Sequence, residues 1–297
     1  MDGLRWTAFM VLCLGLAGAS EVQIINGHEA KPHSRPYMAY LSIEMEDGSG
    51  TCGGFLINPD FILTAAHCNG ESITVVLGAH NMSTRETSWQ LIQAEKMIPH
   101  PDYNSSTLVN DIMLLKALST LLPSPCFVSL SFPAKLILVM TIDGAGLISC
   151  LVFLQLAHKA KLKKQVKLVE IPQADDDVQP GDLCSVAGWG NTVTNGDGSN
   201  VLREVNVTII YWDTCKKSWD AMIPENTICA GGYKTTKGFC QGDSGGPLIC
   251  NNKAMGIVSF NSILGCKYPN LPNVYTSVAP YRDWINSVLQ KHSRSPL

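Results

Sequence analysis

Charged residues are scarce in this chain. Asp, Glu, Lys and Arg make up 16% of its 297 residues, and the formal net charge is only −3. With so little excess charge, neither nucleic acid nor an acidic membrane surface is indicated as a partner. Hydrophobic residues make up 45% of the chain, which is typical of a globular protein and excludes a disordered one. A chain of this length can bury one large core or two smaller ones.

The N-terminal region lacks an apolar run long enough to span a membrane. The run over residues 8–16 is too short for that. Arg5 precedes it and the small residues Ala17-Gly18-Ala19-Ser20 follow it, which is the pattern of a secretory signal peptide. We therefore expect a signal peptide over residues 1–19, with an uncleaved signal anchor as the alternative. A secreted chain meets an oxidising compartment, in which cysteines pair.

Metal-ligand patterns are also missing. No group of His, Cys, Asp and Glu has the spacing of a metal site, and we expect neither a metal nor a cofactor. The chain has eleven cysteines, of which Cys13 would leave with the signal peptide. Spacing alone does not choose among the pairings of the remaining ten.

The chain does contain many short β-like segments, separated by clusters of Gly, Asn and Asp. Such a pattern favours β-barrels or a β-sandwich. One helix is indicated near the C-terminus, where apolar residues recur at helical spacing. The expected strands include 38–43, 72–77, 112–116, 205–211 and 253–259, and the helical positions are Val278, Tyr281, Trp284, Ile285, Val288 and Leu289.

The segment Gly242-Asp243-Ser244-Gly245-Gly246-Pro247 carries the strongest chemical signal. It has little apolar surface to bury, and its glycines are costly to hold in one conformation. That cost is explained if the backbone presents the Ser244 hydroxyl and directs N–H groups at a developing negative charge. Taken alone, the segment is more typical of a glycine-rich turn than of a nucleophile.

Two further segments favour the catalytic interpretation. Residues 63–68 contain His67, and residues 110–115 contain Asp111. His67 suits the role of general base for Ser244, because imidazole titrates near neutral pH. Asp111 would hold the imidazole in the required tautomer and stabilise its charged form. The alternatives are a structural histidine and a solvated carboxylate.

These three segments resemble the chymotrypsin-like serine proteases, together with Ile24-Ile25-Asn26-Gly27 and Gly188-Trp189-Gly190. The segment His33-Ser34-Arg35-Pro36-Tyr37-Met38-Ala39 is similar to granzymes and mast-cell chymases. The resemblance implies an all-β fold of two six-stranded antiparallel β-barrels, with the active site between them and the C-terminal α-helix closing the second barrel. The implied protease domain covers residues 24–297. The implied function is hydrolysis of peptide bonds, through an acyl-enzyme, by a secreted or granule-stored serine endopeptidase.

The resemblance also implies how the nucleophile is supported and activated. The backbone N–H groups of Gly242 and Ser244 would form the oxyanion hole. Cleavage before Ile24 would free an α-amino group that pairs with Asp243, and the free energy of this pairing would order the hole. The alternative for Asp243 is an acid that caps a turn.

Residues 20–23 would then be an activation propeptide. The bond to be cleaved follows Gln23 and not lysine or arginine, which departs from trypsin-activated zymogens. If signal cleavage follows Ala19, two dipeptides remain before Ile24, as a dipeptidyl peptidase would require. Cleavage after Ser20 would leave three residues, which cannot be removed as whole dipeptides.

At the primary substrate pocket, the resemblance places Gly238 and Phe239 at the bottom and Asn261 and Asn273 in the walls. Trypsin-like enzymes have aspartate where Gly238 stands, so nothing here neutralises a basic P1 side chain. The two asparagines replace glycines, and they should narrow the slot and add polar groups that need partners. We expect an uncharged P1 residue, either aromatic or like leucine or methionine, with asparagine as an alternative. The remaining substrate-binding positions are Gln241, Ser259 and Phe260.

Residues 259–261 have two compatible interpretations. Their backbone could bind an extended substrate by strand addition, and they could equally form a plain core strand.

Four disulfides are implied by the resemblance, namely Cys52–Cys68, Cys184–Cys250, Cys215–Cys229 and Cys240–Cys266. The secreted chain also has three acceptor tripeptides for glycosylation, at Asn81, Asn104 and Asn206. The first two look like loop positions, whereas Asn206 falls on an expected strand.

Residues 117–155 do not match the family pattern. They are mostly apolar and show neither strand alternation nor a helical period. Asp143 and Gly144 interrupt the apolar run, which argues against a membrane span. Cys126 and Cys150 lie here. An unstructured apolar loop of this length is unusual in a compact domain. Our hypothesis is a translated intron or gene-model error, because residues 150–155 can be encoded by pyrimidine-rich codons ending in CAG. The alternative is a genuine loop that exposes an apolar patch for aggregation or a partner.

Other function classes are also open. A homologue without activity could act as a binding module, and a mis-spliced isoform could fail to fold. The expected partners are protein and peptide substrates, the activating dipeptidyl peptidase and serpin-type inhibitors, and the expected state is a monomer. The basic segment 159–167 is interpreted as a solvated face, with a proteoglycan site as the alternative.

Overall fold

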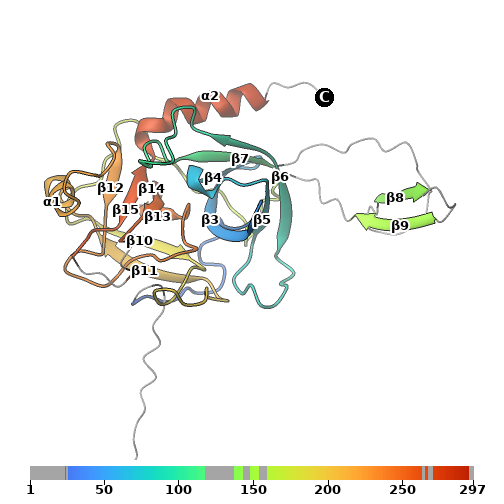
Figure 1. Ribbon diagram of the computed structural model, residues 1–297, viewed down its shortest axis with the longest axis horizontal. Helices are drawn as coiled ribbons and strands as arrows, with labels where there is room; N and C mark the ends of the chain where they lie inside the picture. The colour runs from blue at the N-terminus through green and yellow to red at the C-terminus, as the bar shows by residue number, and fades with distance from the viewer. Residues whose placement is uncertain are drawn as a thin grey trace, which may run out of the picture.

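The computed structural model describes Ile24 and residues 26–117, 137–142, 148–153, 159–262, 265–266 and 270–293. The expected signal peptide and propeptide, as well as Cys126, lie outside these residues. Two β-rich lobes lie side by side, with a helix across the top of Figure 1.

The first lobe is a closed antiparallel barrel of six strands. The strand order is β2-β3-β4-β7-β6-β5. Alternate residues of β2, namely Ala39, Leu41 and Ile43, are at most 1% exposed, because successive side chains of a strand point to opposite faces. The bounds are β2 Met38–Met45, β3 Gly48–Asn58, β4 Phe61–Thr64, β5 Ser72–Leu77, β6 Gln90–Pro99 and β7 Met113–Ala117.

The second lobe is a sheet in the order β1-β11-β10-β13-β14-β15-β12. An antiparallel bridge between Ile209 and Ala230 joins the ends of β11 and β12 and so closes six of these strands into a ring, with β1 added outside. The prediction of two six-stranded barrels is therefore confirmed. The bounds are β1 His28–Glu29, β10 Leu183–Gly188, β11 Arg203–Thr208, β12 Thr227–Cys229, β13 Pro247–Cys250, β14 Lys253–Phe260 and β15 Val274–Ser277.

The C-terminal helix is present as α2 (Arg282–Ser293), preceded by the 3₁₀ turn η2 (Ala279–Tyr281). Our prediction that it closes the second barrel is wrong, because its buried residues pack into the core of the first lobe and it lies over β4 and β7 (Figure 1). Edge-on contact between His292 and Phe61, at 6.0 Å between ring centroids, fixes the helix to β4. The helix α1 (Trp212–Ser218) was not expected.

Part of the unmatched segment forms a separate hairpin. Strands β8 (Ile137–Ile142) and β9 (Ile148–Phe153) pair only with each other. The expectation of no regular structure is corrected here; a continuous apolar run hides a strand from periodicity analysis. Among the described residues, no helix is long and apolar enough to cross a membrane.

The chain leaves and rejoins the first barrel at one turn. The Ala117 N–H donates to the carbonyl of Asp60 at 2.8 Å, and the Ala160 N–H donates to the carbonyl of Pro59 at 2.9 Å. An ion pair of 2.8 Å between Lys159 and Asp60 adds to the same junction. The segment between residues 117 and 160 is therefore an excursion whose two ends meet beside the β3–β4 turn.

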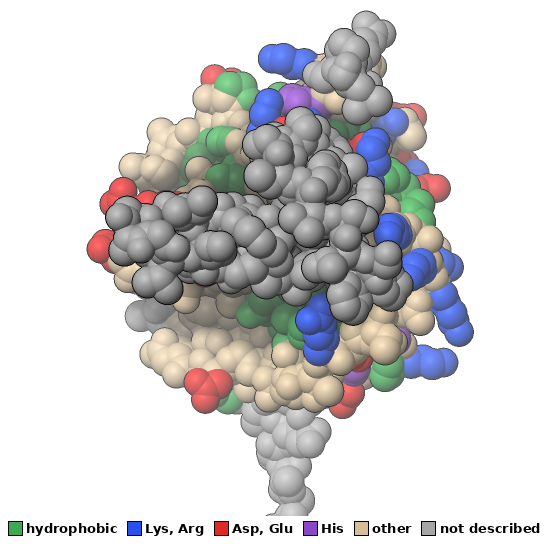
Figure 2. All heavy atoms as spheres, turned by 90° about the vertical axis from the view of Figure 1, so that its right-hand side faces the viewer, with side chains coloured by type: hydrophobic (Ala, Val, Ile, Leu, Met, Phe, Trp, Pro, Cys, Tyr) green, Lys and Arg blue, Asp and Glu red, His purple; other side chains and the backbone are tan. Residues whose placement is uncertain are grey.

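The basic segment 159–167 is exposed to solvent at all five of its lysines. Figure 2 views the molecule from the side of β6 and β7, where Lys and Arg side chains gather along one side of the face. This exposure supports our interpretation of the segment as a solvated surface.

Candidate active site

His67 and Asp111 are brought together by two neighbouring strands. His67 lies in the 3₁₀ turn η1 (Ala66–Cys68) that follows β4, and Asp111 lies two residues before β7, which pairs with β4. The His67 Nδ1 atom is 2.8 Å from Asp111 Oδ2, and the His67 backbone N–H donates to Asp111 Oδ1 at 2.9 Å. These two contacts fix the orientation of the ring.

Asp111 is fully buried, yet its carboxyl group remains acidic. Burial opposes ionisation, but hydrogen bonds from His67 and from Ser259 outweigh it and lower the pKa of Asp111 below its ordinary value. The Ser259 hydroxyl donates to Asp111 Oδ2 at 2.6 Å. Sequence reasoning assigned Ser259 only to substrate binding and missed this side-chain contact.

Ser244 lies against the same part of the first barrel. Its carbonyl accepts a hydrogen bond of 2.7 Å from the Gly53 N–H and lies 3.7 Å from Cys68 Sγ. A Cβ atom added at Gly245 would overlap Thr64 Oγ1, so only glycine permits this approach. The Ser244 segment therefore docks beside the turn that carries His67.

The backbone around Ser244 leaves two donors free. The N–H groups of Asp243, Gly245 and Gly246 all donate to carbonyl groups, whereas those of Gly242 and Ser244 have no backbone acceptor among the described residues. Gly242 has a φ of +90°, which only glycine adopts without strain. The two N–H groups predicted for the oxyanion hole are thus the unpaired ones.

Asp243 is enclosed on all sides. Its Oδ1 accepts from the Gly190 N–H at 2.7 Å, and its Oδ2 accepts from the Cys240 N–H at 3.0 Å. Burial raises the pKa of Asp243 to about 6. A Cβ at Gly188 would overlap its Oδ1, and a Cβ at Gly190 would lie 2.6 Å from its Cγ, which explains both glycines of the Gly-Trp-Gly motif.

Ile24 is fully buried in the core of the second lobe. Its carbonyl accepts a hydrogen bond from the Gly27 N–H. Among the described residues, no cationic group pairs with the Asp243 carboxylate in this uncleaved chain.

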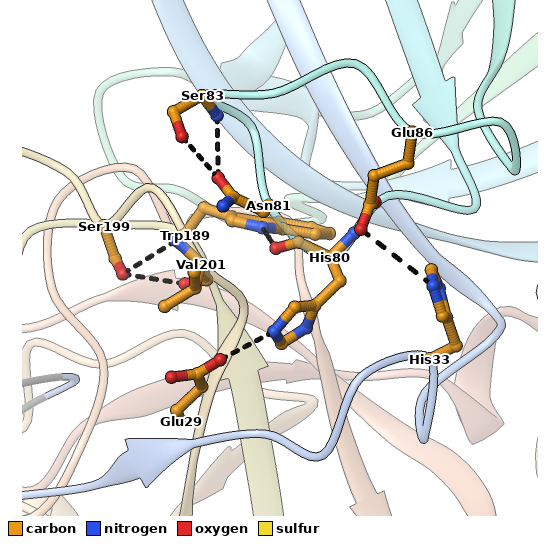
Figure 3. Close-up of polar contacts among 9 residues, drawn as sticks. All are labelled: Glu29, His33, His80, Asn81, Ser83, Glu86, Trp189, Ser199 and Val201. Atoms are coloured by element: carbon orange, nitrogen blue, oxygen red, sulfur yellow. Dashed lines mark hydrogen bonds and ion pairs between the residues drawn. The ribbon is translucent and has the colours of Figure 1, made fainter.

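Trp189, between the two glycines, is anchored to a polar cluster shown in Figure 3. Its indole N–H donates to the carbonyl of His80 at 3.0 Å. The His80 ring in turn contacts Glu29 at 2.8 Å, and His33 lies 4.0 Å from Glu86. This cluster ties the N-terminal segment and the loop around residue 80 to the residues that follow β10. These residues include Gly190, which donates to Asp243.

The residues predicted for the primary pocket pack closely against one another. A Cβ at Gly238 would overlap the amide nitrogen of Asn273. The Asn261 amide donates to the carbonyl of Phe239 at 3.0 Å, and the ring of Phe239 packs edge-on against Tyr275 with centroids 5.2 Å apart. Both asparagines therefore contact residues 238–239.

The other two predicted pocket residues lie nearby. Phe260 packs against Trp219 with ring centroids 5.3 Å apart. Gln241 is exposed, and its side-chain oxygen lies 3.1 Å from Cys266 Sγ.

The four disulfides implied by the resemblance are confirmed, as Cys52–Cys68, Cys184–Cys250, Cys215–Cys229 and Cys240–Cys266. One group of metal-ligating residue types, Cys52, His67 and Cys68, comes together. Both sulfurs are in the disulfide and so are not available to a metal ion.

The three glycosylation acceptors differ in setting. Asn104 and Asn206 are exposed, with Asn206 on β11. Asn81 is half-buried, and its side-chain oxygen accepts hydrogen bonds from the N–H and hydroxyl of Ser83 (Figure 3).

Comparison with known proteins decides the family. The Trypsin family model matches residues 24–137 and 150–285. This chain belongs to the trypsin family. It is 39% identical to sheep mast cell protease 3 over 96% of each chain. It is 41% identical to rat granzyme B, over 95% of this chain and 98% of that protein. It is 38% identical to human cathepsin G, over 92% of this chain and 90% of that protein.

A solved structure described as GrC has the same fold. It superposes with a TM-score of 0.71 and 35% sequence identity, covering 89% of this chain and 99% of that one. The trypsin-family chain is accordingly a chymotrypsin-like serine endopeptidase related to granzymes and chymases.

Proposed function

We propose that Ser244 is the nucleophile of this endopeptidase, with His67 as general base and Asp111 as its orienting carboxylate. The observation that carries the proposal is the partly buried His67–Asp111 contact of 2.8 Å. The docking of the Ser244 carbonyl on Gly53, at 2.7 Å, supports it.

The reaction follows from these groups. The Ser244 hydroxyl oxygen attacks the peptide carbonyl while its proton passes to His67, and the resulting imidazolium is stabilised by Asp111. The unpaired N–H groups of Gly242 and Ser244 donate to the oxyanion, and loss of one such donor typically costs ~10²–10³ in rate. His67 then protonates the leaving amine, and water releases the acyl group by the reverse sequence.

Activation is proposed to follow removal of residues 20–23. The new α-amino group of Ile24 would supply the cation that the buried Asp243 carboxylate lacks in the uncleaved chain. A dipeptidyl peptidase is the proposed activator. N-terminal sequencing of protein made without that peptidase should find Ser20 first, and Glu21 as the first residue would contradict removal in dipeptides.

The localisation, oligomeric state, inhibitors and substrate preference are proposed from the family and from the sequence motifs together. The chain would be secreted or stored in cytolytic or mast-cell granules, act as a monomer and be a target of serpin-type inhibitors. An uncharged P1 residue is proposed because Gly238 supplies no carboxylate and the asparagines narrow the slot. Asn104 is proposed as glycosylated because it is exposed on a loop.

The proposal is tested by peptide hydrolysis with the chain matured to Ile24. Wild-type protein should cleave peptide substrates, and Ser244→Ala and His67→Ala should each lower kcat by at least about 10³-fold. A folded, matured wild type with no more activity than Ser244→Ala would support a binding module instead.

A further inference from the structure

Asn110 has a left-handed backbone conformation directly before the proposed orienting carboxylate. Its φ is +58°, a region that few residues other than glycine occupy, although asparagine tolerates it better than most. The Ile112 N–H donates to the Asn110 carbonyl at 2.8 Å, so Asp111 is the central residue of a γ-turn. The backbone conformation at Asn110 therefore helps to set the direction in which the Asp111 side chain leaves the chain.

The Asn110 side chain is held at both of its polar atoms. Its Oδ1 accepts from the Tyr281 hydroxyl at 2.8 Å, and its Nδ2 donates to the carbonyl of Asp102 at 2.9 Å. The Asp102 N–H donates to His100 Nδ1 at 3.2 Å, and the His100 ring packs edge-on against Tyr281 with centroids 5.3 Å apart. These four residues form a closed circuit of contacts, and three of them belong to the connection between β6 and β7 that carries Asp111.

Tyr281 comes from outside this connection. It ends the turn η2, which lies between β15 of the second lobe and α2, and it is 5% exposed within the core of the first lobe. Burial raises the pKa of Tyr281, while a hydrogen bond from the side chain of Asn226, which immediately precedes β12, acts in the opposite direction. The Tyr281 hydroxyl thus links the second lobe to the backbone that carries Asp111.

We propose that Tyr281 and Asn110 are positioning residues for peptide hydrolysis, because the tyrosine hydroxyl holds the Asn110 turn and thereby holds Asp111 against His67. This inference rests on the proposed roles of Asp111 and His67. Hydrogen bonds from His67 and Ser259 align the oxygens of the carboxylate. The Tyr281–Asn110 hydrogen bond aligns the backbone from which the carboxylate projects. A small displacement of such a group slows the chemical step.

A purely structural role for this hydrogen bond would give a different result. It would lower the free energy of unfolding and leave kcat unchanged in molecules that stay folded. Tyr281→Phe keeps the ring that packs on His100 and removes only the hydroxyl. Asn110→Gly allows the left-handed backbone without strain and removes only the side chain. These two variants therefore test the hydrogen bond with little change in packing.

The test measures kcat and KM for peptide hydrolysis with chain matured to Ile24, at a temperature at which every variant is folded. Tyr281→Phe should lower kcat about 3- to 10-fold, as expected for the loss of one hydrogen bond, with KM little changed. In the Asn110→Gly background, Tyr281→Phe should lower kcat no further, because the acceptor is already absent. The matched control is Tyr211→Phe, whose residue is 66% exposed, and it should keep the wild-type kcat and KM.

A fluorophosphonate probe, which reacts with an activated serine, separates failure of the inference from failure of the proposed function. Wild type that labels on Ser244, together with a wild-type kcat in Tyr281→Phe, overturns the inference alone. A fall of kcat in the Asn110→Gly background that equals the fall in wild type also overturns it, because the effect would then not pass through Asn110. Wild type that does not label overturns the proposed function on which the inference rests.

Discussion

The hydroxyl of Ser259 donates to Asp111 at 2.6 Å, and it does so to Oδ2, the same oxygen that contacts the His67 ring. One carboxylate oxygen is thus held from two sides, by β14 of the second lobe and by the turn after β4 of the first. The orientation of the proposed general base therefore depends on contact between the two lobes.

Replacing Ser259 should slow the chemistry more than substrate binding. Ser259→Ala removes one hydrogen bond to a charged group, worth about 1.5–3 kcal/mol, so kcat should fall about 10-fold or more with KM little changed. The matched control is Ser199→Ala, whose hydroxyl donates to the Val201 carbonyl at 2.7 Å, away from His67. A wild-type kcat for Ser259→Ala would show that the contact does not position Asp111.

This contact also marks the limit of what the sequence could predict. His67, Asp111 and Ser244 lie in motifs whose neighbours identify them. A single serine in a strand carries no such local signal, and Ser259 is 148 residues from Asp111. Only the packing of the two lobes brings them together.

For the fold too, local patterns predicted the elements, whereas contacts between distant residues could not be predicted. Short β-like segments and turn residues predicted β-barrels or a β-sandwich, the family resemblance implied two barrels, and the apolar stripe predicted α2. The lobe on which α2 packs depends on distant partners such as Phe61, which the helical period does not reveal. The short helix α1 was missed because only one of its seven residues, Cys215, is buried, which leaves no apolar stripe for the helical period to reveal. The orientation of the Asn273 amide likewise depends on Gly238 and Tyr275, which pattern analysis does not place.

Asp243 should contribute less to the stability of the uncleaved chain at neutral than at acidic pH. Its pKa in the folded chain is about 6, above the ordinary value of 3.8. Folding therefore favours the protonated form, and stability is lost as the pH rises from about 4 to 6. Asp243→Asn should stabilise the uncleaved chain at pH 7.5 by on the order of 1–3 kcal/mol and make little difference at pH 4.

Urea unfolding of the uncleaved protein at both pH values measures this effect. The exposed substitution Asp47→Asn is the control and should change the free energy of unfolding equally at the two pH values. A difference between Asp243→Asn and wild type that is the same at pH 4 and pH 7.5 would contradict the account.

Deleting residues 117–155 should leave the two barrels intact. The chain leaves and rejoins the first barrel at Pro59 and Asp60, and β8 and β9 pair with neither barrel, so the deletion takes from the described barrel strands only Ala117, the last residue of β7. The shortened chain should unfold cooperatively and label with a fluorophosphonate at the wild-type rate once matured. Loss of folding would show that the segment is part of the domain.

Transcript sequencing tests the origin of the same segment. The intron hypothesis predicts that the predominant message joins the codon for Lys116 to that for Leu156. A predominant message that contains the segment would contradict the hypothesis.

Covalent labelling of Ser244 tests the central claim most directly. The chain is matured to Ile24, its new N-terminus is confirmed by sequencing, and it is treated with a fluorophosphonate probe before intact-mass and peptide analysis. We predict one adduct per chain, located on Ser244 and absent from His67→Ala and from the uncleaved chain. A folded, correctly matured protein that carries no adduct on Ser244 would contradict the catalytic assignment.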